Sequence, residues 1–321
     1  MTILVTGAAG FIGSYVCRAL AARGESVVGL DNFNDYYDPR IKRDRVAAIC
    51  ADVRIAEVDL ADGAAIQALF ADIKPDRVVH LAAQAGVRYS ISNPKVYADS
   101  NLLGFTHILE ACRHGGVRHL VYASSSSVYG GNAVPPFSEN QRIDQPLSFY
   151  AATKAANELM AHTYAHLYQL PVTGLRFFTV YGAWGRPDMA PVLFSRAVLA
   201  GRAIEVFNHG RMRRDFTHID DIVAGVIGAL ESPSTDAKPH QLFNLGNHTP
   251  VELERFIAVI EQAAGQPARK IYKDMQPGDM VETMADTARA RAAFGFDPSA
   301  TIEQKLPDVV AWCRDYFGDK A

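Results

Sequence analysis

The sequence predicts an α/β protein with a doubly wound parallel sheet, followed by a smaller mixed α/β domain. Three observations support this fold class. A glycine-rich turn joins the first strand to the first helix, strands and helices then alternate, and this alternation loosens after about residue 180. Regular alternation of strands and helices is typical of a parallel sheet that is covered by helices on both faces.

The first strand and the turn after it carry a dinucleotide-binding pattern. Residues 2–6 form a short apolar run rich in β-branched side chains, which predicts a buried strand, and a helical pattern covers residues 11–22. Gly7, Gly10 and Gly13 follow the strand at three-residue spacing. Glycines here allow a tight turn and let a pyrophosphate approach the backbone N–H groups at the helix N-terminus.

A carboxylate at the end of the second strand indicates which dinucleotide binds. This strand covers residues 26–30 and is followed by Asp31. A carboxylate in this place can accept hydrogen bonds from the ribose hydroxyls of NAD, and it would repel the 2′-phosphate of NADP. Strand, turn, helix, strand and acid together predict NAD binding by a Rossmann-type domain.

The rest of the chain continues the alternation and then changes character. Further strands are predicted over residues 53–57, 77–81, 118–123 and 172–178, and helices over residues 62–72, 96–113 and 149–169. We expect residues 1–180 to form the NAD-binding domain, with later segments returning to it, and residues 181–321 mainly to bind the substrate. Glycine, proline and charged residues cluster in this second part. We place it over the carboxyl ends of the strands, where ligands bind in such sheets.

A tyrosine and a lysine supply candidate proton-transfer chemistry. Tyr150 and Lys154 are four residues apart, so they share one face of a helix. An ammonium beside a phenol favours the phenolate and lowers its pKa, which makes the phenol a usable base near neutral pH. Serines occupy positions 124–127, directly after a predicted buried strand, and one of their hydroxyls can complete a proton relay. In isolation, the same Tyr–Lys spacing also occurs on surface helices.

Composition excludes several other classes of protein. The 321 residues are 49% hydrophobic with a formal net charge of −3, so no overall basic field exists to attract nucleic acid. The four cysteines are scattered without a Cys-x-x-Cys pair, as in core thiols of a reducing compartment, and the histidines lack the spacing of metal ligands. No segment predicts a signal peptide or a membrane span. We therefore expect a cytoplasmic protein that needs no metal.

The glycine turn and the Tyr–Lys pair together point to one superfamily. The pattern Thr-Gly-x-x-Gly-x-x-Gly at residues 6–13, combined with Tyr150 and Lys154, resembles the extended short-chain dehydrogenase/reductase superfamily. The resemblance covers nearly the whole chain. It implies a tightly bound NAD that is regenerated in each turnover, and cofactor contacts by Gly7, Gly10, Phe11, Ile12, Gly13, Asp31, Asn32, Asp59, Leu60, Leu81, Ala82, Ala83, Asn101, Tyr150, Lys154 and Phe178.

The resemblance also implies a homodimer. In this superfamily, the helices that correspond to residues 96–113 and 149–169 form a four-helix bundle between two subunits. Both segments carry apolar residues on more than one side. Packing of these helices within the chain is the alternative explanation for that pattern.

Two serines narrow the reaction. In the sugar-nucleotide branch of the superfamily, epimerases, 4,6-dehydratases and decarboxylases all begin by oxidising C4 of the sugar, with the tyrosine taking the hydroxyl proton and NAD the hydride. The dehydratases carry an Asp-Glu pair directly before the Val-Tyr-Gly triplet, where this chain has Ser126 and Ser127, and the decarboxylases carry Glu at the second position. Serine hydroxyls are too weakly acidic to shuttle protons for an elimination near pH 7. The resemblance therefore implies 4-epimerisation.

Further segments indicate the substrate. Four of them are similar to those of UDP-glucuronate 4-epimerases, at residues 34–39, 84–90, 123–130 and 207–210. This resemblance implies conversion of UDP-glucuronic acid into UDP-galacturonic acid, in polysaccharide biosynthesis, with Ser125 assisting Tyr150. A guanidinium at Arg186 can grip the sugar carboxylate bidentately. Substrate contacts are implied for Arg88, Ser126, Ser127, Thr179, Arg186, Phe207, Arg214 and Asp279.

Three alternatives stay open: a 4-epimerase of neutral UDP-sugars, a UDP-glucuronate decarboxylase, and a non-catalytic NAD-binding regulatory protein. The regulatory protein would have no need of Ser125, Tyr150 and Lys154 together. Many epimerases of neutral sugars carry Arg before a Pro-Gly-Asp turn, whereas this chain has Gln276 there. Because of this difference, the second contact to the diphosphate of a UDP-sugar stays open.

Overall fold

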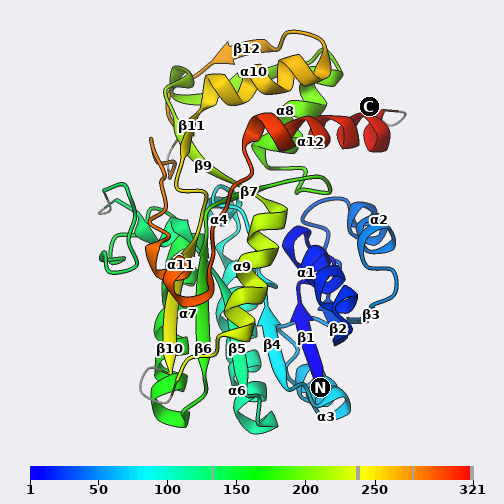
Figure 1. Cartoon of the computed structure of the whole chain (residues 1–321), viewed down its shortest axis with the longest axis vertical. Helices are drawn as coiled ribbons and strands as arrows, with labels where there is room; N and C mark the ends of the chain where they lie inside the picture. The colour runs from blue at the N-terminus through cyan, green and yellow to red at the C-terminus, as the bar shows by residue number, and fades with distance from the viewer. Residues whose placement is uncertain (132–133, 236–238, 277, 319–321) are drawn as a thin grey trace.

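A seven-stranded parallel sheet forms the centre of the larger, lower part of the molecule (Figure 1). The computed structural model describes residues 1–131, 134–235, 239–276 and 278–318. Within them, the strand order is β10-β6-β5-β4-β1-β2-β3, and all neighbouring strands are parallel. The winding of the chain reverses between β1 and β4, so the predicted doubly wound fold class is confirmed. The strands are β1 Thr2–Thr6, β2 Ser26–Asp31, β3 Arg54–Glu57, β4 Arg77–His80, β5 His119–Ser125, β6 Val172–Phe177 and β10 His240–Leu245.

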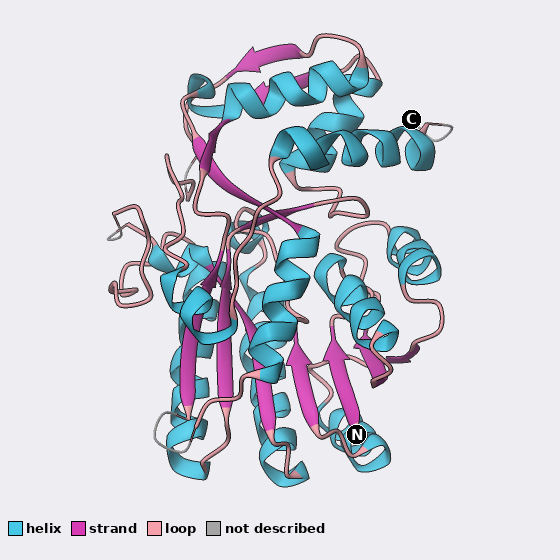
Figure 2. Ribbon diagram, viewed as in Figure 1, coloured by secondary structure: helices cyan, strands magenta, loops and turns pink. Residues whose placement is uncertain are grey.

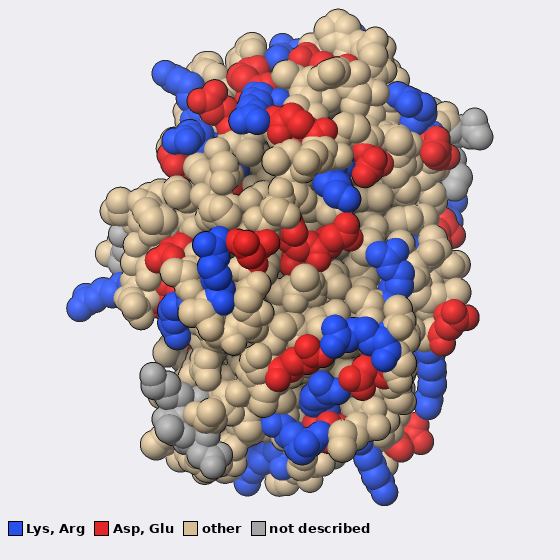
Figure 3. Space-filling view, viewed as in Figure 1, with Lys and Arg blue, Asp and Glu red and all other residues tan. Residues whose placement is uncertain are grey.

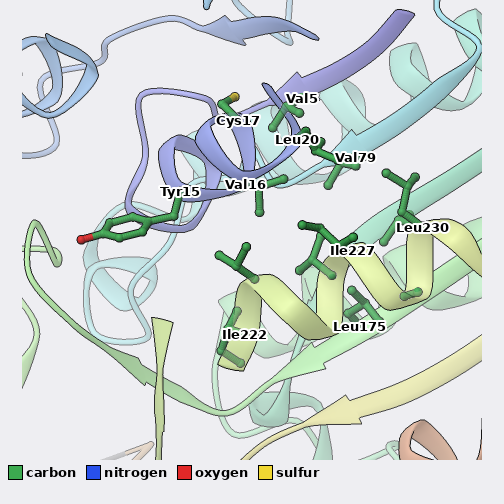
Figure 4. Packing of buried hydrophobic residues seen from close by; sticks show 14 of the residues in the cluster. Val5, Tyr15, Val16, Cys17, Leu20, Val79, Leu175, Ile222, Ile227 and Leu230 are labelled. Atoms are coloured by element: carbon green, nitrogen blue, oxygen red, sulfur yellow. The ribbon is translucent and has the colours of Figure 1, made fainter. Parts of the chain in front are cut away.

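Helices cover both faces of the sheet because its strands are apolar on both faces. Successive strand residues point to opposite faces, so Val5 packs in one helical layer and Leu4 in the other. Figure 4 shows the first layer, where Val16 of α1 and Ile227 of α9 belong to one buried cluster. This layer contains α1 Phe11–Ala22, α9 Ile219–Glu231 and α11 Ala288–Phe294, and the other contains α3 Gly63–Ile73, α6 Gly104–Gly115 and α7 Phe149–Tyr168.

A second apolar core lies beyond the carboxyl ends of the strands (Figure 2). Phe194, Phe256 and Leu306 join three helices there. Two small sheets accompany them, with strand orders β11-β9-β7 and β12-β8. These elements are β7 Thr179–Tyr181, α8 Ala190–Leu199, β8 Ala203–Val206, β9 Arg213–His218, β11 Pro250–Glu252, α10 Leu253–Ala264, β12 Arg269–Tyr272 and α12 Ile302–Phe317.

Segments from the second half of the sequence also belong to the large sheet. Strand β10 pairs with β6 in parallel, and α9 and α11 pack on the same face as α1. The division into domains at residue 180 stays a prediction. The remaining described elements are short or peripheral: α2 Pro39–Ile49, α4 Tyr89–Ser92 and the 3₁₀ turns η2 Ser126–Tyr129 and η3 Phe207–Gly210.

A π-helical segment interrupts the helix that the sequence predicts over residues 96–113. The chain runs from α5 (Pro94–Tyr97) into the π-helix η1 (Ala98–Leu103), and only then does α6 begin. Within η1, the Asn101 side chain bonds the Gln84 backbone, donating to its carbonyl at 3.0 Å and accepting from its N–H at 2.8 Å. The predicted helix is therefore present as one helical run, but apolar periodicity did not reveal its widened π-helical turn.

The surface carries charges of both signs. On the face shown in Figure 3, Lys and Arg side chains lie among Asp and Glu side chains rather than in one patch. None of the described helices is long and apolar enough to cross a membrane. The four cysteines are buried free thiols, and the described residues include no group of three or more His, Cys, Asp or Glu side chains that could hold a metal ion.

Candidate active site

A cavity of about 480 Å³ opens at the carboxyl ends of the central strands. It brings together the glycine turn, the end of β5, the start of α7, the loop after β7, strand β9 and the segment after β12. Fifteen of the sixteen predicted cofactor contacts line it: Gly7, Gly10, Phe11, Ile12, Gly13, Asp31, Asn32, Asp59, Leu60, Leu81, Ala82, Ala83, Tyr150, Lys154 and Phe178. Asn101 does not, because its amide is turned to the Gln84 backbone behind the cavity wall.

The glycine turn is packed too tightly for side chains. Gly7 has a φ of +71°, in the left-handed region that favours glycine. A Cβ on Gly13 would lie 2.0 Å from the Gly7 carbonyl oxygen, and a Cβ on Gly10 would lie 2.9 Å from the same atom. The backbone at the N-terminus of α1 is therefore bare toward the cavity, as the pyrophosphate of a dinucleotide requires.

The end of β2 fits the ribose of NAD. The Asp31 carboxylate is 7% exposed and is held by two backbone N–H groups, from Ala9 at 3.1 Å and from Phe33 at 2.8 Å. Each carboxylate oxygen can accept a second hydrogen bond, so ribose hydroxyls can still be bound. Asn32 donates to Asp59 at 2.9 Å, which orients a second carboxylate on the same side. These residues therefore fit a bound NAD.

Proton-transfer groups meet where β5 and α7 adjoin. Ser125 ends β5, and Tyr150 and Lys154 lie on the first turns of α7, which is capped by a hydrogen bond from the Ala151 N–H to the Ser148 hydroxyl. The Lys154 ammonium donates to the Ala123 carbonyl at 2.8 Å. This bond ties the helix to the end of the strand.

The pKa of Tyr150 differs from the expectation. Burial raises the pKa of the Tyr150 phenol above its ordinary value, while a hydrogen bond with Ser125 and the charge on Arg186 lower it. The predicted lowering of this pKa by Lys154 is wrong for this structure, because the ammonium is directed to the Ala123 carbonyl. Ser125 and Arg186 are thus the neighbours that favour the phenolate.

The other end of the cavity is rich in arginine. Six of the predicted substrate contacts line the cavity: Ser126, Ser127, Thr179, Arg186, Arg214 and Asp279. The remaining two, Arg88 and Phe207, lie outside its lining. The Arg88 guanidinium donates to Asp279 at 3.2 Å and stands 4.8 Å from the centre of the Phe207 ring, so these residues still border the same end. Burial lowers the pKa of Arg214, and the charge of Asp279 opposes this effect.

Comparison with known families shows where the chain belongs. A model of the NAD dependent epimerase/dehydratase family matches residues 3–246. The chain belongs to this family. The match spans the glycine turn, the Tyr–Lys pair and the central sheet up to the end of β10.

Individual epimerase/dehydratase relatives match along the whole chain. UDP-glucuronate 4-epimerase 3 of Arabidopsis thaliana is 47% identical, over 100% of this chain and 78% of the plant protein. Protein CapI of Staphylococcus aureus is 48% identical, over 99% of both chains. A crystal structure of UDP-glucuronic acid 4-epimerase from Bacillus cereus, in complex with UDP-glucuronic acid and NAD, superposes with a TM-score of 0.91 at 32% identity, covering 98% of this chain and all of the other.

The site of this epimerase/dehydratase also contains residues that the sequence analysis missed. Lys42 is buried against the cavity, and its ammonium donates to the Asn34 carbonyl at 2.9 Å and to the Asn34 side chain at 2.7 Å. Tyr36 lines the cavity and donates to Asp188 at 2.9 Å. Tyr36 lies in segment 34–39 and Lys42 follows it closely. The resemblance of that segment to UDP-glucuronate 4-epimerases was therefore the signal that could have found them.

A buried ion pair joins α7, the helix of Tyr150 and Lys154, to strand β6. Arg176 of β6 and Glu158 of α7 are 2% and 3% exposed, and their side chains approach to 2.7 Å. The Ser124 hydroxyl donates to the same carboxylate at 2.6 Å. Glu158 follows Lys154 by one helical turn. Burial lowers the pKa of Lys154 and the Glu158 charge opposes this, which leaves that pKa at about 8.

Proposed function

We propose that this protein is a 4-epimerase that interconverts UDP-glucuronic acid and UDP-galacturonic acid. One observation carries the proposal: the cavity that holds Tyr150 and the NAD-type glycine turn has serines at positions 126 and 127 and a guanidinium at Arg186. Such a site can oxidise a sugar and bind a carboxylate. Serines at these two positions supply no acid–base pair for an elimination.

The residues of this chain move one proton and hold the sugar. NAD, when bound, supplies the reversible oxidation at C4. In the forward half of the reaction, the Tyr150 phenolate accepts the proton of the C4 hydroxyl, with Ser125 as its hydrogen-bond partner. After the 4-keto sugar turns over, Tyr150 returns the proton to the C4 oxygen. No proton is gained or lost in the cycle, so one tyrosine suffices.

Retention of the carboxylate is the second task of the site. Oxidation of C4 in a uronate places a ketone β to the carboxylate, and such acids lose carbon dioxide when the breaking C–C bond aligns with the carbonyl π system. A charged and hydrogen-bonded carboxylate, held out of that alignment, is protected. Arg186, together with the hydroxyls of Ser126, Ser127 and Thr179, lines the cavity where such a clamp is needed.

The relatives support this substrate. Proteins named UDP-glucuronate 4-epimerase in Arabidopsis thaliana and Bacillus cereus match this chain along its length. We extend their activity, and with it a tightly held NAD and a place in cytoplasmic polysaccharide biosynthesis, to this protein. We also propose a homodimer, which the superfamily resemblance implies and for which exposed apolar side chains on α5, η1 and α7 are available: Val96, Leu103, Leu159 and Leu167.

A 4-epimerase of neutral UDP-sugars is the second candidate. Arg186 already has a carboxylate partner inside the protein, because it forms an ion pair with Asp188. A guanidinium that is neutralised in this way can also border a sugar without a charge. The two candidates share the oxidation at C4, and UDP-glucose differs from UDP-glucuronic acid only at C6 of the sugar.

One incubation separates these candidates. Purified protein is mixed with UDP-glucuronic acid without added NAD, and the products are resolved by anion-exchange chromatography and mass. A new peak of unchanged mass that co-elutes with UDP-galacturonic acid is the expected result, and it would show that NAD co-purifies. A product lighter by carbon dioxide would identify a decarboxylase. If UDP-glucose reacts and UDP-glucuronic acid does not, even with NAD added, the second candidate holds.

A further inference from the structure

Three side chains from two loops form a polar cluster at the substrate end of the cavity. The Arg186 Nε donates to Asp188 Oδ1 at 3.1 Å, and Nη2 donates to Asp188 Oδ2. The Tyr36 hydroxyl donates to the same Oδ2 at 2.9 Å. Tyr36 and Arg186 line the cavity, whereas Asp188 lies behind them. The cluster thus presents the Arg186 guanidinium to the cavity, and the Asp188 carboxylate lies on the side away from it.

The ion pair uses only one edge of the guanidinium. Arginine has five N–H donors in a planar fork, and Asp188 engages the edge formed by Nε and Nη2. Neither of the two bonds to Asp188 uses Nη1. The second edge, formed by Nη1 and the other proton of Nη2, is therefore left for a planar anion.

Tyr36 is itself held in place. Its ring lies 4.9 Å from the Tyr89 ring, and a Cβ on Gly86 would come within 2.5 Å of its hydroxyl oxygen. The Arg186 guanidinium carbon stands 5.8 Å from the centre of the Tyr36 ring. Burial and Asp188 raise the pKa of Tyr36 to about 12 against the opposing effect of Arg186, so its hydroxyl stays a donor at neutral pH.

We propose that Asp188 and Tyr36 are positioning residues that present the free edge of Arg186 to the carboxylate of a uronosyl substrate. This inference rests on the proposed function, because only a charged sugar needs that edge. Arg186 and Asp188 together carry no net charge, so selectivity for the uronate comes from the direction of the remaining donors. A free arginine would have to give up side-chain entropy to reach the same geometry.

Two variants test the inference. Tyr36→Phe removes one hydroxyl and keeps the ring, and Asp188→Asn keeps the shape and removes the charge. For both we expect KM for UDP-glucuronic acid to rise by about 10-fold, the loss of one hydrogen bond to a charged group. The KM for UDP-glucose should stay unchanged in both variants. Thermal unfolding of each variant shows whether the fold is kept. The share of UDP-glucuronic acid that is converted into a product lacking carbon dioxide should also rise.

The double variant Arg186→Ala/Asp188→Asn shows whether Asp188 acts through Arg186. If it does, the double variant has the KM of Arg186→Ala alone, since the two losses are coupled. A lower KM for UDP-glucuronic acid in Asp188→Asn would overturn the inference and make Asp188 a competitor of the substrate. An unchanged KM in both single variants would overturn it too. If the wild type does not turn over UDP-glucuronic acid, the proposed function and this inference fail together. If the wild type is active and the variants match it, the inference alone fails.

Discussion

Glu158 lies one helical turn after Lys154 on α7, and its charge acts against the effect of burial on the Lys154 ammonium. Both side chains belong to residues that are 3% exposed. The carboxylate is fixed by Arg176 and Ser124, so it cannot turn away from the lysine. The balance of the two effects leaves the pKa of Lys154 at about 8, below its ordinary value of 10.5.

This pKa predicts an alkaline limb in the activity profile. Lys154 is charged below its pKa and loses its charge as pH rises through about 8. A neutral amine is a weaker donor to the Ala123 carbonyl, and that bond ties the helix of Tyr150 to the end of β5. We therefore expect kcat/KM, which reports on groups of the free enzyme, to fall above that pH. The measurement is kcat/KM for UDP-glucuronic acid between pH 6 and pH 10, with retained NAD followed by absorbance as the control. A profile that stays level to pH 10 contradicts the prediction.

The ion pair beneath Lys154 predicts a large loss of stability. Glu158→Gln leaves the Arg176 charge buried at 2% exposure without its partner, and breaking a buried pair in this way costs about 3–5 kcal/mol in the free energy of unfolding. Urea denaturation measures this change. The matched control is Glu231→Gln, whose pair with Arg23 is nearly half exposed on both sides, so about 0–1 kcal/mol is expected. Equal effects of the two substitutions would contradict the argument.

The elements that could be predicted from the sequence are those that depend on residues close together in the chain. The glycine turn, α1 and the acid at the end of β2 each follow from adjacent residues, and the structure places them around one cavity. The Tyr36–Asp188 contact joins residues 152 positions apart, and no local pattern announces it. The prediction that Asn101 contacts NAD rested only on the resemblance of the chain to the superfamily. In the structure, the π-helical turn directs the Asn101 amide to the Gln84 backbone.

Close packing of the glycine turn predicts a selective loss of NAD. In Gly13→Ala the new Cβ would meet the Gly7 carbonyl oxygen at 2.0 Å, so the turn must move. Such overpacking costs about 1–3 kcal/mol, and we expect the purified variant to carry much less NAD than the wild type. Gly115→Ala is the matched control, because its Cβ would lie 3.6 Å from Phe70, an ordinary contact. Full NAD content in Gly13→Ala would contradict the assigned role of the turn.

Loss of the Arg186 guanidinium predicts both weaker binding and a side reaction. Arg186→Ala removes a charge-assisted grip on the carboxylate, so KM for UDP-glucuronic acid should rise about 10- to 100-fold. The freed carboxylate can align with the C4 carbonyl, and UDP-4-keto-pentose should appear by mass. Arg196→Ala serves as the control, because that guanidinium stacks on Phe317 in the second core. Wild-type kinetics with UDP-glucuronic acid in Arg186→Ala would remove Arg186 from the site.

Removal of the Tyr150 hydroxyl distinguishes an enzyme from a protein that only binds NAD. Tyr150→Phe keeps the ring, which contacts Tyr97 edge-on at 6.1 Å between centroids, so the fold and the NAD content should stay unchanged. The C4 proton then has no acceptor, and kcat should fall by about 10²- to 10⁴-fold, the usual contribution of a general base. Tyr168→Phe, at the far end of the same helix and 41% exposed, should keep wild-type turnover. If Tyr150→Phe retained most of its kcat, proton transfer would belong to another group, and Ser125 would be the next residue to replace.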